Sequence, residues 1–105
     1  MIDLHTHTTF SDGALIPIEL IRRAEEVGYR AIGLTDHADD SNYQFIIDNV
    51  IRACRTANEC WSIRAIAGVE LTHNPPARIP GLVRECRDLG AQIIVVHGET
   101  IVEPV

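Results

Sequence analysis

The sequence predicts an α/β fold in which a parallel sheet of about four strands alternates with three helices. Three observations support this prediction. Short apolar runs alternate with longer segments in which apolar residues recur at helical spacing. One strand with its helix occupies about 30 residues, the size of a parallel βα unit with a right-handed crossover. Finally, metal-ligand residue types directly follow the strands, at the edge where parallel α/β proteins place their active sites.

The first strand is expected over residues 1–7. Because side chains alternate along a strand, His5 and His7 should point to the same face, and the residue between them to the other. The first helix is expected over 16–27, with a proline in its first turn and Gly28 just after its end.

The second strand is expected over residues 31–37, where a mostly apolar run suits a strand covered on both faces. Ser41 and Gln44 have the spacing of a capping box, which marks the start of the second helix. An apolar stripe from Phe45 to Ala57 continues that helix.

The third strand, 63–69, runs up to Glu70. A third helix should begin near Pro80 and end at Gly90, because proline suits the first helical turn and glycine the position after the last. The most strand-like segment of the sequence, 92–96, then forms the last strand.

The residues at or just beyond the carboxyl ends of these strands include four histidines and one glutamate: His5, His7, His37, Glu70 and His97. Imidazole and carboxylate are suitable ligands for zinc, manganese or iron, and this set is large enough for more than one ion. The turn after the first strand adds the carboxylate of Asp12 above the same edge. A carboxylate such as Glu70 can bridge two ions, an arrangement used in phosphoester hydrolysis.

Composition narrows the class of protein. The 105 residues form at most one domain, and the net charge of −6 does not favour capture of nucleic acid or of an anionic membrane. Three cysteines without a paired spacing are expected to be reduced. No signal peptide or long apolar run is evident, so a cytoplasmic location is expected.

Four separated motifs resemble those of the PHP (polymerase and histidinol phosphatase) superfamily, and most of all small archaeal members described as histidinol-phosphatase-like. The motifs are His5-Thr6-His7-Thr8 with Ser11-Asp12-Gly13, Thr35-Asp36-His37, Gly68-Val69-Glu70 and Val96-His97-Gly98. The resemblance implies a seven-stranded (β/α) barrel, of which residues 1–105 would be the N-terminal part, a TIM-like half-barrel. Either the sequence is a fragment or truncated gene product, or two chains join to close a barrel.

The resemblance also implies two or three divalent ions and a set of ligands: His5, His7, Asp12, His37, Glu70 and His97. The first two ions would share Glu70, with the histidines of the first strand on one side and His97 on the other. Asp12 and His37 would belong to the third ion. The implied reaction is hydrolysis of a phosphoric ester by a metal-bound hydroxide.

Two further residues have open interpretations. His73, three residues beyond Glu70, either contacts the substrate or bonds to the backbone. Asp36 points away from His37 along the strand, and it is expected to support a neighbouring ligand or to cap a helix.

Three functions remain open. The first is a metal-dependent phosphoesterase that hydrolyses a small phosphate monoester resembling histidinol phosphate. The second is a PHP-type nuclease, which the acidic balance does not favour. The third is a truncated, non-catalytic module that binds metal or a partner. The open strand edges of a half-barrel also predict self-association.

Overall fold

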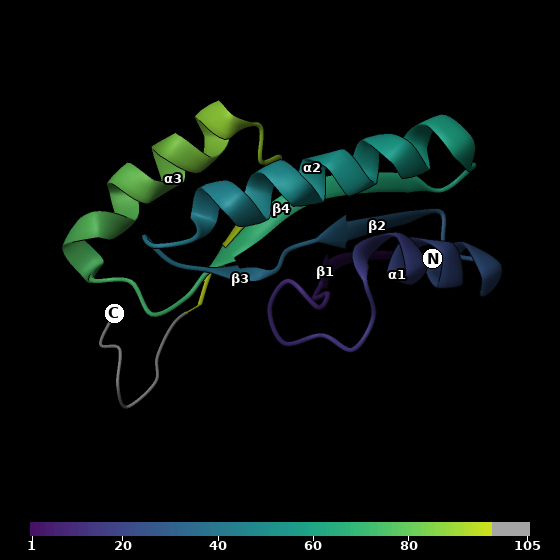
Figure 1. Cartoon of the computed structure of the whole chain (residues 1–105), viewed down its shortest axis with the longest axis horizontal. Helices are drawn as coiled ribbons and strands as arrows, with labels where there is room; N and C mark the ends of the chain where they lie inside the picture. The colour runs from purple at the N-terminus through teal and green to yellow at the C-terminus, as the bar shows by residue number, and fades with distance from the viewer. Residues whose placement is uncertain (98–105) are drawn as a thin grey trace.

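The computed structural model describes residues 1–97, which form five strands, three α-helices and one short 3-10 helix. In chain order these elements are β1 Ile2–Thr6, α1 Pro17–Glu26, β2 Ala31–Leu34, β3 His37–Ala38, α2 Tyr43–Cys60, β4 Arg64–Leu71, η1 Pro76–Arg78, α3 Ile79–Leu89 and β5 Ile93–Val96 (Figure 1). Gly98, the last residue of the fourth sequence motif, lies outside the described residues.

All strand pairs are parallel. β1 pairs with β2, β2 and β3 follow one another along the same edge of β4, and β5 pairs along the other edge of β4. The predicted second strand is therefore present but interrupted at Thr35 and Asp36. The ladder continues through the break, because the backbone amide of Glu70 donates to the carbonyl of Asp36 (2.8 Å). The predicted α/β fold, a parallel half-barrel with four strand positions and three helices, is confirmed.

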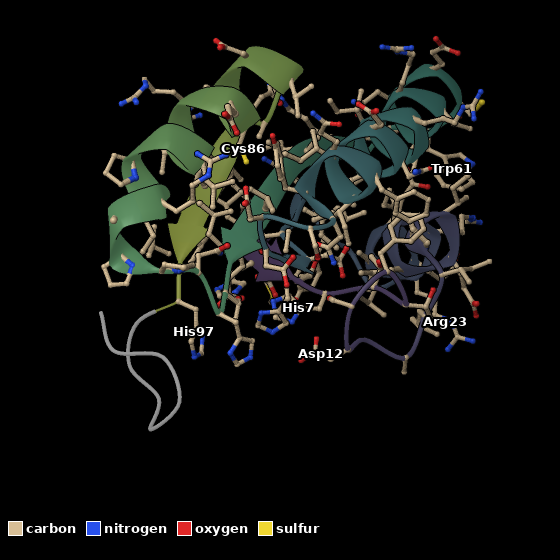
Figure 2. All side chains as sticks on the ribbon, turned by 60° about the vertical axis from the view of Figure 1, so that its left-hand side comes forward. His7, Asp12, Arg23, Trp61, Cys86 and His97 are labelled. Atoms are coloured by element: carbon tan, nitrogen blue, oxygen red, sulfur yellow. The ribbon has the colours of Figure 1, made fainter. Side chains whose placement is uncertain are left out.

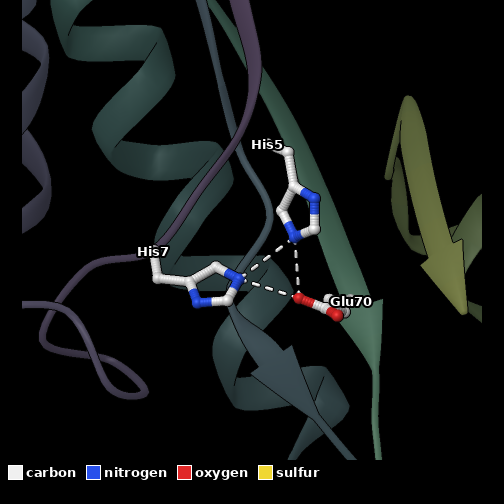
Figure 3. Close-up of side chains that lie close together, drawn as sticks. All are labelled: His5, His7 and Glu70. Atoms are coloured by element: carbon white, nitrogen blue, oxygen red, sulfur yellow. Dashed lines mark hydrogen bonds and ion pairs between the residues drawn. The ribbon is translucent and has the colours of Figure 1, made fainter. Parts of the chain in front are cut away.

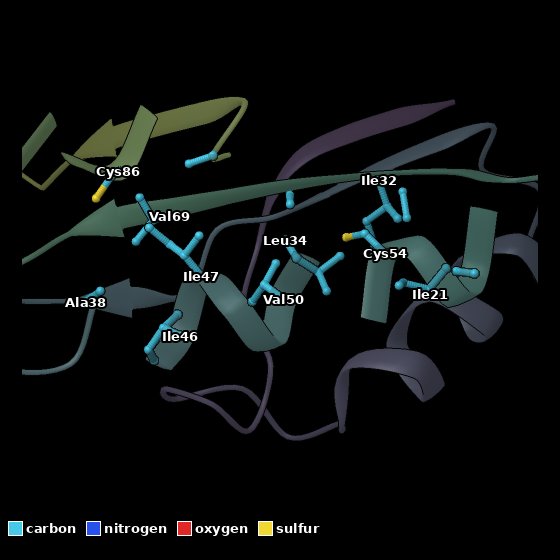
Figure 4. Packing of buried hydrophobic residues seen from close by; sticks show 14 of the residues in the cluster. Ile21, Ile32, Leu34, Ala38, Ile46, Ile47, Val50, Cys54, Val69 and Cys86 are labelled. Carbon is cyan, nitrogen blue, oxygen red and sulfur yellow. The ribbon is translucent and has the colours of Figure 1, made fainter. Parts of the chain in front are cut away.

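The three helices cover one face of the sheet, with α1 and α3 packed on either side of α2. Figure 4 shows Val50 and Cys54 of α2 against Ile32 and Leu34 of β2, with Val69 of β4 in the same cluster. These side chains are at most 4% exposed. Burial of this continuous apolar layer, at about 25 cal/mol per Å² of apolar surface, is the main force that holds the helices to the sheet.

The other face of the sheet is not covered by any described helix or strand. Side chains alternate along β4, so Ala65, Ala67 and Val69 face the helices, whereas Ile66 and Glu70 face away. The metal-ligand candidate of β4 therefore lies on the uncovered face.

The ends of α2 and α3 test the predicted capping box and the predicted helix-terminating glycine. Gly90 has a left-handed φ of 111° directly after α3, as expected of a helix-terminating glycine. The predicted capping box of α2 is wrong, since α2 begins at Tyr43 and no side chain caps it. Ser41 instead donates its hydroxyl proton to Asp39. The apolar stripe that predicted this helix is confirmed, although Phe45 at its start is 63% exposed.

No helix among residues 1–97 is long and apolar enough to cross a membrane.

Candidate metal centre

The carboxyl ends of the strands bring the predicted ligands to one edge of the sheet. His37 in β3 lies opposite Glu70 in β4, and the amide of His97 extends the β4–β5 ladder by donating to the carbonyl of Leu71 (2.9 Å). In Figure 2, His7, Asp12 and His97 gather on one side of the molecule. Parallel strand direction is the physical reason, because it places every strand end at the same edge.

Three ligand atoms converge in a first cluster (Figure 3). The Nε2 atoms of His5 and His7 lie 3.3 Å apart, and each lies 2.8 Å from Oε1 of Glu70. Ligands about 2.0–2.2 Å from one ion are about 2.9–3.5 Å apart in octahedral or tetrahedral geometry. The observed spacing is thus close to the edges of a coordination shell, and the cluster can hold one divalent cation.

The irregularity of β1 contributes to this convergence. The register with β2 shifts between Asp3 and Thr6, so strict alternation does not hold through the strand. His7 lies just beyond the last residue of β1, where the chain is free to turn its ring toward His5. The predicted shared direction of the two histidines is confirmed, although the regular strand geometry behind that prediction is not.

Glu70 is the centre of the site. It is 4% exposed, and a buried carboxylate requires compensation by opposite charges or hydrogen bonds. Burial opposes its ionisation, but hydrogen bonds with His5, His97 and His7 outweigh this effect and lower the pKa of Glu70. Its second oxygen, Oε2, lies 3.1 Å from Nδ1 of His97. Glu70 therefore presents Oε1 to His5 and His7 and Oε2 to His97, the arrangement that a bridging carboxylate requires.

A second cluster consists of His7, Asp12 and His37. Nδ1 of His7 lies 2.7 Å from Oδ1 of Asp12, and Nε2 of His37 lies 3.2 Å from Oδ2. Burial of His7 works against its protonation, but the hydrogen bonds with Asp12 and Glu70 raise its pKa. The hydrogen bond with His7 in turn lowers the pKa of Asp12.

His7 belongs to both clusters but can serve only one of them as a ligand. A neutral imidazole has one nitrogen with a free lone pair and one that carries a proton. If Nε2 of His7 binds the ion beside Glu70, Nδ1–H donates to Asp12 and fixes the ring, as in carboxylate–histidine–metal arrangements. Oδ2 of Asp12 then stays available, with His37, for a further ion.

Thr72 sets the orientation of His37. The Thr72 hydroxyl lies 2.6 Å from Nδ1 of His37 and donates its proton to the carbonyl of Glu70 (3.3 Å). It therefore accepts from Nδ1–H, and Nε2 of His37 keeps its lone pair facing Asp12. Two acceptors, Nε2 and a carboxylate oxygen, face each other across 3.2 Å, an arrangement that a cation between them stabilises.

Asp36 holds the loop that carries Asp12. Its fully buried carboxylate accepts hydrogen bonds from the amide of Thr8 (2.6 Å), the hydroxyl of Thr8 (2.8 Å) and the hydroxyl of Ser11 (2.6 Å). The geometry agrees with the predicted supporting role of Asp36. Gly13 completes the turn, because a Cβ at this position would lie 2.2 Å from the carbonyl oxygen of His7.

The structure thus brings all six predicted ligands to one edge of the sheet; their binding of metal stays a prediction. His73 lies in the loop after β4 with a left-handed φ of 60°, and neither cluster of the described residues includes it. Sequence reasoning missed the positioning roles of Thr8, Ser11 and Thr72. Thr8 and Ser11 belong to the first motif and Thr72 follows Glu70 by two residues; these positions were the only available signal, since a hydroxyl partner depends on tertiary contact.

The sequence is similar to known proteins over most of its length. The family model of the PHP domain matches residues 3–98. An uncharacterised protein of Methanocaldococcus jannaschii is 56% identical over 104 residues, which are 98% of this chain and 48% of that protein. A 5'-3' exoribonuclease of Haemophilus influenzae is 38% identical over 72 residues, 69% of this chain and 23% of the relative.

An error-prone DNA polymerase of Mycolicibacterium paratuberculosis is 37% identical over 78 residues, 72% of this chain and 6% of the polymerase. The chain therefore spans about half the length of the Methanocaldococcus protein, at 48%, and much smaller parts of the named enzymes. No solved structure matches the chain.

Proposed function

This chain belongs to the PHP domain family, and we propose on that premise that it carries ligands of a hydrolase that cleaves a phosphoric ester with bound divalent cations. The observation that supports this proposal is the convergence of His5, His7 and Glu70, whose ligand atoms lie 2.8–3.3 Å apart. Zinc, manganese and iron are all compatible with imidazole and carboxylate ligands.

The proposed centre holds two or three ions. His5, His7 and one oxygen of Glu70 hold the first, and the other oxygen of Glu70 with His97 holds the second. The remaining ligands, Asp12 and His37, hold the third. When bound, such ions supply an acidified water as nucleophile and neutralise the phosphate oxygens.

The residues of the chain contribute positioning and proton placement. The Asp12 carboxylate orients the ring of His7, and the Thr72 hydroxyl orients the ring of His37. Each pairing keeps the ring proton away from the nitrogen that faces the proposed ion. The buried Glu70 offers a charged ligand whose lowered pKa keeps it ionised at neutral pH.

We propose a small phosphate monoester, resembling histidinol phosphate, as the substrate. The net charge of −6 makes broad attraction of a nucleic-acid backbone unfavourable, so the ions themselves must attract the phosphate. His73 is proposed to contact the substrate, because it lies in the loop that leaves the ligand-bearing end of β4. In this proposal residues 1–105 correspond to the N-terminal part of a PHP domain.

A nuclease is the second candidate, and the comparisons favour it in one respect. The matched relatives with named activities include an exoribonuclease and DNA polymerases. Their printed names describe those proteins, and the chain spans only 6–23% of the two relatives described above.

The decisive experiment compares two substrates under the same metal conditions. The chain is stripped of metal, supplied with Mn²⁺, Zn²⁺ or Fe²⁺, and assayed with p-nitrophenyl phosphate and with a short RNA. Glu70→Gln removes the bridging charge, and Glu59→Gln, exposed near the far end of α2, is the matched control.

We expect metal-dependent hydrolysis of the small ester that Glu70→Gln abolishes and Glu59→Gln retains. If the chain cleaves the RNA and not the small ester, the nuclease becomes the supported function. Stoichiometric metal binding without turnover of either substrate supports the non-catalytic module. A chain that binds no divalent metal refutes the proposal.

A further inference from the structure

Asp12 has the most exposed side chain of the two ligand clusters. It is 64% exposed, against 26% for His37 and 5% for Glu70. Asp12 also lies in the turn between β1 and α1, outside any helix or strand. An exposed side chain loses conformational freedom when it binds a ligand, so its affinity for an ion depends on how firmly the turn is already held.

The hydroxyl of Ser11 connects this turn to the buried part of the sheet. The amides of Ser11 and Gly13 both donate to the carbonyl of Thr8 (3.1 and 2.9 Å), which closes the turn on itself. The Ser11 hydroxyl, directly before Asp12, donates to Oδ1 of Asp36 (2.6 Å). The backbone bonds thus shape the turn, whereas the Ser11 hydroxyl ties it to Asp36.

Asp36 is a fixed point for this bond. Its side chain is fully buried, and Thr8 supplies two further donors to it (2.6 and 2.8 Å). The carbonyl of Asp36 accepts from the amide of Glu70 (2.8 Å), and the next residue in the chain is His37. The Ser11 bond therefore ties the turn to the backbone of both ligand-bearing strands, β3 and β4.

We propose that Ser11 is a positioning residue for the ion assigned to Asp12 and His37, and that its hydrogen bond with Asp36 determines how tightly this ion is bound. The inference rests on the proposed function. Without the Ser11 hydroxyl, Oδ2 of Asp12 is no longer held 3.2 Å from Nε2 of His37, so the two ligands must be brought together at the moment of binding. Phe10 still packs against the core, so the turn is loosened and not unfolded.

The ligands around Glu70 have no such dependence on the turn. His5 belongs to β1 and His7 directly follows it, so their approach to Glu70 of β4 is set by the pairing of the strands. If Asp12 moves, water can take its place beside Nδ1–H of His7, because the Asp12 side chain is already 64% exposed. Loss of the Ser11 hydroxyl should therefore weaken one ion and leave the others nearly unchanged.

The test counts divalent ions per chain by equilibrium dialysis and elemental analysis over a range of free Mn²⁺ or Zn²⁺. Ser11→Ala should weaken one ion about 10- to 100-fold, the loss typical of a residue that orients a metal ligand. Near the lowest concentration that saturates the wild type, it should bind one ion fewer, as should His37→Gln, which removes a proposed ligand of the same ion.

Two further variants separate positioning from a general effect on the fold. Ser11→Thr keeps the hydroxyl and should restore the wild-type number of ions. Ser41→Ala is the matched control, because it removes a serine hydroxyl that also donates to an aspartate, Asp39, in the loop after β3. It should bind ions as the wild type does. In metal-free protein, hydrogen exchange of the amides of residues 8–13 should be faster in Ser11→Ala than in Ser41→Ala.

The possible failures are distinct. The positioning role is overturned if Ser11→Ala binds as many ions as the wild type, if Ser11→Thr does not restore the number, or if all ions weaken equally. Loss of helix content by circular dichroism in Ser11→Ala assigns the bond to folding and also overturns that role. A wild type whose ion count His37→Gln does not change overturns this inference and leaves the proposed function intact. A wild type without divalent ions refutes both.

Discussion

Replacement of Glu70 by glutamine is the most informative perturbation of the proposed centre. Glutamine keeps the size of the side chain but removes the charge that lies 2.8 Å from His5 and His7 and 3.1 Å from His97. Loss of a residue that merely orients a ligand reduces metal affinity about 10- to 100-fold. Loss of a ligand that serves two ions should therefore reach at least about 100-fold.

Thermal unfolding converts this factor into a shift that can be measured. With metal at about 100 times the wild-type Kd, binding stabilises the folded state by about 2.7 kcal/mol. For a domain of this size that corresponds to a rise in Tm of about 10–20 °C over the sample with chelator. In Glu70→Gln the same metal concentration equals the weakened Kd, so the gain falls to about 0.4 kcal/mol and about 2–3 °C.

The metal-induced shift is measured as the difference between each variant with metal and the same variant with chelator. This difference removes any effect of the substitution on the metal-free fold. Glu59→Gln should show the full wild-type shift, and a variant of one histidine such as His5→Gln should show an intermediate one. A wild-type shift in Glu70→Gln would refute the bridging role.

Three further predictions concern the surroundings of the site and the core. Asp36→Ala removes the acceptor of three hydrogen bonds, and we expect it to destabilise the chain by about 3 kcal/mol in urea unfolding. In metal-free protein the raised pKa of His7 means that its pair with Asp12 stabilises the fold fully below the unfolded pKa near 6.5. Stability should then fall as pH rises through the higher folded value, and Asp12→Asn should reduce this pH dependence, because Glu70 still raises the pKa of His7. Burial raises the pKa of the Cys54 thiol to about 12, whereas Cys60 is exposed. After alkylation at pH 8, ~0.5 below the usual thiol pKa, mass spectrometry should therefore find Cys60 modified and Cys54 protected.

Much of the fold was predictable because its signals are local. Gly28 and Gly90 follow the helices with left-handed φ angles of 100° and 111°, which are conformations that glycine adopts without strain. The apolar periods of the strands and helices indicated their order, and parallel strand direction then implied that the strand-end ligands share one edge. The candidate site was predictable for the same reason.

Other features were not predictable because they depend on competition between contacts. The Ser41 hydroxyl bonds to Asp39 in place of a helix amide, so a correctly spaced capping box does not form. Phe45 lies on the apolar stripe of α2 but is 63% exposed, so a helical stripe does not by itself say which of its residues reach the core. The capping-box prediction failed because it considered a local hydrogen-bonding preference without the contacts that compete with it.

The sequence by itself determined the class of fold and the set of candidate metal ligands, because strand period, helix-terminating residues and side-chain chemistry are properties of short segments. Only the tertiary structure decided how those ligands are shared. It placed His7 between Glu70 and Asp12, and it placed the Thr72 hydroxyl against His37. Such choices depend on distances of about 3 Å between residues far apart in the chain, which packing of the sheet and its helices sets.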